Sequence, residues 1–258
     1  MDELIPVKSS GYARYEELLL ERDALKKEAG SMMTAYIREF GELITDIFSA
    51  KIEAIRLKKS ITICQMSINR GAHVNPAEME ARVKEMMQGY YEQLKAMLAD
   101  NKAAKDAKTI PEHILYKVKK LYRRLAMLIH PDLNPKTAGD ENLSELWQRL
   151  TAAYNASDLS GMEELEILIK LAVSDGGETP EIENVEEKIS ELEAEIDEIR
   201  TTDPYLYKDL LSDKEAVEEK KESLRKELQE YKDYTSELQD TLNKMMLMAG
   251  VDVTWQEN

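Results

Sequence analysis

The chain has 258 residues, of which 43% are hydrophobic and 33% charged, so it can bury a core and remain in solution. A formal net charge of −16 excludes a protein that binds nucleic acid over its whole surface. The single cysteine, Cys64, excludes an internal disulfide framework and a thiolate zinc site. The histidines lie far apart in sequence, so we expect no metal and no cofactor. Because the start lacks a signal-peptide pattern and apolar runs are short, we expect a cytoplasmic protein.

Glycine and proline are sparse, at 10 and 7 residues, which favours long helices and an all-α, elongated fold. The first predicted helix runs from about residue 12 to 29 and is expected to be interrupted at Gly30. A long second helix then reaches about residue 69. Gly71 is expected to end it, and Asn75-Pro76 to begin the next helix. Residues 1–108 should therefore form a long antiparallel hairpin. Residues at helical spacing form a stripe along one face of its first helix: Tyr15, Leu18, Leu19, Arg22 and Leu25. The stripe of its last helix consists of Met79, Val83, Met86, Tyr90, Leu94 and Met97.

The sequence pattern of residues 109–173 predicts a second, shorter helical hairpin. Thr109 to Glu112 resembles a capping box, and an apolar stripe follows as far as Leu128. The helix should stop at His130, because the residue before a proline is disfavoured in a helix. After a polar loop, leucines at helical spacing predict a returning helix that reaches Tyr154, and a short helix continues to 173.

The last part of the chain reads as a linker (174–181), a coiled-coil segment (182–250) and a tail (251–258). Its helices carry two seams with heptad-like spacing, from Ile182 to Ile199 and from Val217 to Met245. If the two fold back on each other, the later helix overhangs with an apolar stripe of Leu238, Leu242, Met245 and Met246. We expect a second copy of the chain to cover that stripe, which would make a homodimer. Docking on the N-terminal hairpin of the same chain is the competing interpretation.

The motif that carries information is the stretch from Lys117 to Tyr154. A basic helix ends in His130-Pro131-Asp132, a loop follows, and an antiparallel helix returns to an Ala153-Tyr154 pair. This arrangement resembles the J domain of DnaJ-type co-chaperones, over about a quarter of the chain. The proline should hold Asp132 at an exposed hairpin tip that a partner can reach. The cations on the outer side of the basic helix would suit an acidic partner surface.

The resemblance implies that this hairpin docks on a DnaK-type ATPase chaperone and promotes its ATP hydrolysis, without catalytic activity of its own. The leading hypothesis is thus a co-chaperone and not an enzyme. The alternative is an adaptor or structural coiled-coil protein that kept the hairpin and lost the activity. Carried over by position, the contact candidates are Lys117, Lys119, Lys120, Tyr122, Arg123, Arg124, His130, Pro131, Asp132 and Asn134.

Several features depart from the family pattern, among them Ile129 in place of the usual aromatic residue before His-Pro-Asp. Family members open with a short extra helix, typically Tyr-Tyr-x-x-Leu-Gly, and residues 100–109 contain nothing similar. The residue after His-Pro-Asp is usually basic, whereas here it is Leu133.

Overall fold

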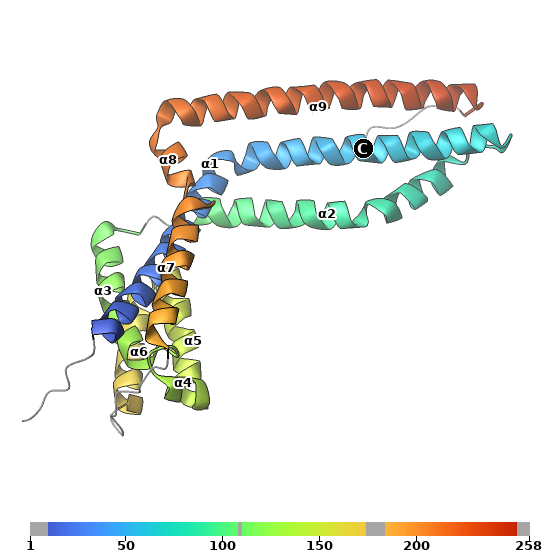
Figure 1. The fold of residues 1–258 in the computed structure, drawn as a ribbon. Coiled ribbons are helices and arrows are strands. Elements are labelled where there is room, and N and C mark those ends of the chain that lie inside the picture. The colour runs from blue at the N-terminus through green and yellow to red at the C-terminus, as the bar shows by residue number, and fades with distance from the viewer. Residues whose placement is uncertain (1–9, 108–109, 174–183, 252–258) are drawn as a thin grey trace, which may run out of the picture. The chain divides into compact units, whose positions relative to one another are not determined.

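The structure, a computed structural model, describes residues 10–107, 110–173 and 184–251, and the regular secondary structure in these ranges is entirely α-helical (Figure 1). The predicted all-α class is therefore confirmed. The predicted linker 174–181, the tail beyond residue 251 and the start signal at Thr109 lie outside the described residues. In chain order the helices are α1 (Ser10–Asn69), α2 (Pro76–Asp106), α3 (Glu112–Ile129), α4 (Pro135–Gly139), α5 (Glu141–Ala156), α6 (Leu159–Val173), α7 (Val185–Thr201), α8 (Tyr207–Ser212) and α9 (Lys214–Met248).

The expected interruption at Gly30 is wrong, because α1 is one continuous helix of 60 residues. A glycine inside a helix costs only about 0.5–1 kcal/mol relative to alanine. Buried residues before and after it, such as Leu25 and Phe40, hold the helix in place on both sides. Packing thus outweighs the local preference of Gly30.

The turn between α1 and α2 forms as predicted. Gly71 adopts a left-handed conformation with φ of 65°. The Asn75 side chain accepts hydrogen bonds from the backbone N–H groups of Ala77 and Glu78, and Pro76 occupies the first turn of α2. The capping residue thus satisfies N–H groups that a helix start leaves free.

The chain divides into two compact units that cut across the predicted segments. The first unit contains residues 1–33 and 108–207, and the second contains 34–107 and 208–258. The N-terminal helix contributes to both units. The predicted 109–173 hairpin belongs to the first unit, together with the start of α1 and with α7.

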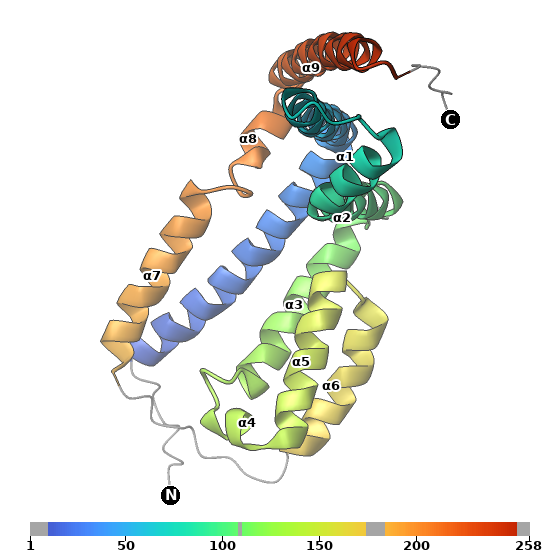
Figure 2. The same cartoon turned by 90° about the vertical axis from the view of Figure 1, so that its right-hand side faces the viewer.

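In the second unit, α1 lies between α2 and α9 (Figures 1 and 2). Leu242 and Met246 of α9 are buried with Leu57 and Cys64 of α1. The stripe that suggested a homodimer is therefore covered within the same chain, as the competing interpretation has it. Self-association stays a prediction, but that stripe no longer argues for it.

One predicted stripe on α2 is shifted. Met87 is fully buried, whereas Met86 and Tyr90, expected inside, are 48% and 37% exposed. Steps of four residues keep Met87 in line with Met79 and Val83, which pack in the same cluster.

The first unit combines the start of α1, α7 and the short helices α3 to α6. Figure 2 shows the start of α1 between α7 and α3. The predicted seam on α7 is real, but it packs against α1: Leu192 and Ile196 are buried with Leu18 and Leu19.

Candidate functional site

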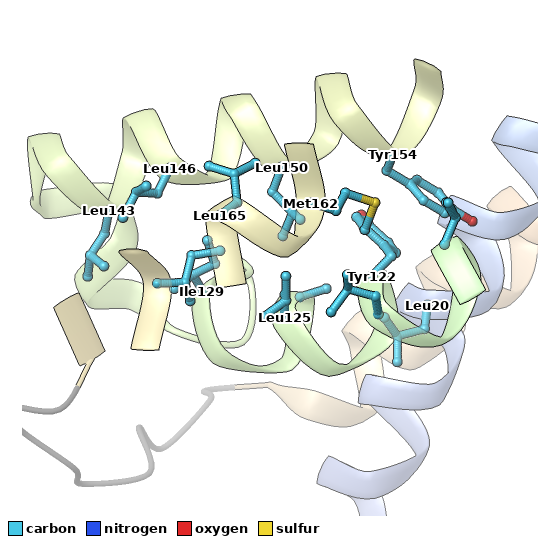
Figure 3. Packing of buried hydrophobic residues seen from close by; sticks show 14 residues of the cluster. Leu20, Tyr122, Leu125, Ile129, Leu143, Leu146, Leu150, Tyr154, Met162 and Leu165 are labelled. Atoms are coloured by element: carbon cyan, nitrogen blue, oxygen red, sulfur yellow. The ribbon is translucent and has the colours of Figure 1, made fainter. Parts of the chain in front are cut away.

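The predicted hairpin of α3 and α5 forms around an apolar core. Leu125 and Ile129 of α3 point toward Leu146 and Leu150 of α5 (Figure 3), and α6 completes the cluster. At one end of this core the rings of Tyr122 and Tyr154 stack with their centroids 3.8 Å apart. The stacked tyrosines thus close the end of the core that lies away from the turn between α3 and α5 (Figure 3).

The His-Pro-Asp turn is fixed by hydrogen bonds of its own backbone. His130 ends α3 in an extended conformation with φ of −63° and ψ of 126°, as expected for a residue before proline. Its carbonyl accepts the N–H groups of Leu133 and Asn134 at 3.0 and 2.7 Å. The Asn134 side chain donates to the Leu128 carbonyl and caps α4 by accepting from Lys136 N–H. Asn134 is therefore a structural residue of this turn.

The His130 side chain is buried, with 3% of its surface exposed. Its Nδ1 accepts the Asp132 N–H at 3.1 Å, which places the proton of the neutral ring on Nε2. The ring meets Trp147 at a centroid distance of 4.5 Å in an edge contact. Burial lowers the pKa of His130, although the nearby carboxylates of Asp23 and Asp132 act in the opposite direction. The expectation of an exposed tip is therefore wrong for His130, because Trp147 of α5 and residues of α1 enclose its ring.

The covering residues come from α1. Asp23 accepts a hydrogen bond from the Tyr122 hydroxyl at 2.6 Å, and the same carboxylate oxygen lies 3.8 Å from His130 Nε2. Arg22 donates to Asp23 through Nε and Nη2. Burial, followed by the charge of Asp23, raises the pKa of Tyr122, so its hydroxyl remains a proton donor.

Asp132 differs from His130, because its side chain is 46% exposed. Its carboxylate lies 3.9 Å from Nη1 of Arg22. The next residue, Leu133, is buried among Tyr15, Leu18 and Leu192, and its carbonyl accepts the Tyr12 hydroxyl. A leucine at this place suits an apolar pocket that a basic residue could not enter without loss of solvation.

The predicted basic face is largely solvent-exposed. Lys117, Lys119, Lys120 and Arg123 are exposed on α3. Arg124 is exposed as well, and it forms an ion pair with Glu166 of α6 at 2.8 Å. The structure thus separates the predicted contact residues into exposed cations on α3 and a turn that faces α1.

The sequence did not point to Asp23, Lys27 or Trp147 as neighbours of this site. Lys27 donates to the Tyr154 carbonyl and lies 4.0 Å from the centre of the Tyr154 ring. Burial lowers its pKa to about 8. One signal was present: Arg22 occupies a position in the apolar stripe of the first helix, where a charged side chain needs a partner.

Within the described ranges, no group of three or more His, Cys, Asp and Glu side chains is placed to hold a metal ion. None of the helices that the structure describes contains an apolar stretch long enough to span a bilayer. Comparisons with models of protein families, with curated proteins and with solved structures found no match to this chain.

Proposed function

We propose that this chain is a J-type co-chaperone, which recruits a DnaK-type ATPase chaperone and stimulates its ATP hydrolysis. The observation that carries the proposal is the His130-Pro131-Asp132 turn at the end of a basic helix within an antiparallel hairpin. Hydrogen bonds of its own backbone hold this turn in a fixed geometry.

The electrostatics of the hairpin support a negatively charged partner surface. Five exposed cations follow one another on α3 of a chain whose net charge is −16: Lys117, Lys119, Lys120, Arg123 and Arg124. Such a local patch steers an acidic surface toward it and raises the association rate at low salt. Arg124 contributes less to this patch, because the carboxylate of Glu166 offsets part of its charge.

Asp132 is the side chain of the tripeptide that a partner reaches first. Its carboxylate is half exposed, whereas His130 is enclosed. In this proposal the chain supplies no group to the chemistry of ATP hydrolysis. Its residues bind and orient the ATPase, which carries out the reaction itself.

Single-turnover ATP hydrolysis by a DnaK-type chaperone, with and without this protein, tests the proposal. We expect stimulation by the wild type and its loss in Asp132→Asn, because the variant removes the exposed carboxylate and leaves the core intact. Asp140→Asn is the matched control: Asp140 caps α5, and asparagine caps a helix as well as aspartate does. Equal stimulation by wild type and Asp132→Asn would overturn the proposal. His130→Gln is a poorer probe, since it also removes a buried ring that packs on Trp147.

The second candidate function is an adaptor that uses the hairpin only as a structural element. The buried Leu133 favours it, because an apolar residue replaces a position that the family pattern makes basic. An adaptor would bind no DnaK-type chaperone, even when its turn is made accessible by substitution.

A further inference from the structure

The N-terminal arm, defined as residues 10–33 of α1, covers the His-Pro-Asp turn. Asp23 faces both His130 and Tyr122, at 3.8 and 2.6 Å. Arg22 lies 3.9 Å from the Asp132 carboxylate. The resemblance assigns His130, Tyr122 and Asp132 to partner recognition, but in this structure these residues already contact side chains of α1.

The arm is held over the turn by apolar and by charged contacts. Leu19 is fully buried in a cluster that includes Leu133. Arg22 and Lys26 form ion pairs with Glu195 of α7, at 3.7 and 2.6 Å. The charged part lies near the surface, so salt and charge reversal should weaken it.

We propose that the N-terminal arm is an intramolecular cover, which competes with a DnaK-type ATPase for the His-Pro-Asp turn. The inference rests on the proposed co-chaperone function and adds its regulation. A cover that is closed in 99 of 100 molecules lowers the apparent affinity of the partner about 100-fold. A partner or modification that loosens the arm would then expose the turn and allow the hairpin to bind the ATPase.

The sequence places a weak point at the end of the arm. Gly30 is one of three glycines in α1, with Gly11 and Gly41, and glycine loses more conformational freedom on folding than other residues. Gly30 lies three residues before the boundary between the compact units, which falls after Met33. The helix can therefore bend or unwind there when the arm leaves the hairpin.

The cover can be tested without any partner by the rate at which diethyl pyrocarbonate modifies His130. This reagent attacks accessible neutral imidazole nitrogens, and the exposed His73 and His113 serve as internal references. We expect His130 to react at least tenfold more slowly than either of them in the wild-type chain.

Two variants open the cover in different ways. Glu195→Lys places a positive charge against Arg22 and Lys26, and Leu19→Ala weakens the apolar contact without altering the core between α3 and α5. Their matched controls lie in the second unit: Glu227→Lys places a positive charge against Lys51, and Leu57→Ala truncates an equally buried leucine. We expect at least a tenfold faster modification of His130 in the opening variants and no change in the controls.

Binding of a DnaK-type ATPase in its ATP state to the same four variants and the wild type completes the test. We expect the opening variants to bind at least tenfold more tightly than the wild type and the controls. If His130 becomes reactive but the affinity stays at the wild-type value, the arm does not compete and the cover is overturned. The cover also fails if His130 of the wild type reacts as fast as His73. If the opened variants bind no chaperone at all, the co-chaperone function itself fails, and the cover then has no competitor.

Discussion

Helix α1 packs in two chemically different ways along its length. Around Leu57 and Cys64 its neighbours are apolar side chains of α2 and α9. Around Asp23 its neighbours include a tyrosine hydroxyl, a histidine ring and several charged groups. Apolar burial is non-directional and involves no charge that can be titrated or screened, whereas contacts of ionisable groups depend on pH, and those near the surface also depend on salt. The same helix therefore builds one interface suited to permanent packing and another suited to release.

Substitution in the apolar interface should have the largest effect on stability. Leu57→Ala removes a fully buried side chain and should lower the free energy of unfolding by about 2–5 kcal/mol. Chemical denaturation at low and high salt measures it. The loss should be the same at both, because no ion pair is removed. A loss that shrinks at high salt would contradict the division between the two interfaces.

The polar interface should respond to loss of a single acceptor. Asp23→Ala leaves the buried Tyr122 hydroxyl without its acceptor and removes the carboxylate to which Arg22 donates, which should cost about 1–3 kcal/mol. Tyr122→Phe should reduce this cost when both changes are combined, because the unsatisfied hydroxyl is then absent. A double-mutant cycle by urea denaturation measures the coupling.

Asp46→Ala is the control for this cycle, since Asp46 is an exposed aspartate on the same helix. We expect it to change stability by less than about 0.5 kcal/mol. Additive effects of Asp23→Ala and Tyr122→Phe on the free energy of unfolding would show that their hydrogen bond does not stabilise the packing of the arm.

Two lysines of α1 sharpen the comparison through their opposite pKa shifts. Lys27 lies over the Tyr154 ring and its pKa is lowered to about 8 by burial, whereas hydrogen bonding to Glu227 raises the pKa of Lys51, which lies over Tyr231. Between pH 8 and 10.5 the unfolded chain holds a proton that folded Lys27 has lost. Stability therefore rises with pH in this window.

The measurement compares the wild type with Lys27→Met from pH 7 to 10. The stability of the wild type relative to this variant should rise by about 1–2 kcal/mol, a value reduced for the half-exposed amine. Lys51→Met should show no such rise, because the pKa of Lys51 is shifted the other way. A flat difference for Lys27→Met would indicate that its amine is fully solvated.

Local signals predicted much of the fold because they depend on neighbouring residues. The start of α2 follows from Asn75-Pro76, and the end of α3 follows from Pro131, whatever the rest of the chain does. The hairpin of α3 and α5 was predictable for the same reason. By contrast, Asp23 and Tyr122 lie 99 residues apart, and no periodicity relates them.

The sequence therefore indicated which residues form the candidate site, but it did not indicate which other parts of the chain pack around them. The sequence located His130 and Asp132, yet it suggested that both were exposed. Covering of the turn depends on which helix packs against Leu133, and many amphipathic helices in this chain have a suitable stripe. Two local signs were present: Arg22 in the apolar stripe of the first helix, and Leu133 at a position that is basic in the family which the hairpin resembles.

The smallest expected effect concerns Gly30. A Cβ atom at this position would meet no atom within 4 Å, so Gly30→Ala introduces no clash. The variant should stabilise the folded chain by about 0.5–1 kcal/mol, because alanine restricts the unfolded backbone and favours the helix. If the arm leaves the turn by bending at Gly30, the same substitution also slows modification of His130 by diethyl pyrocarbonate. Gly89→Ala is the matched control: this glycine lies inside α2, and a Cβ atom there also meets nothing within 4 Å. Both variants should gain similar stability, but only Gly30→Ala should protect His130. Equal His130 reactivity in the two variants would show that the arm does not open at Gly30.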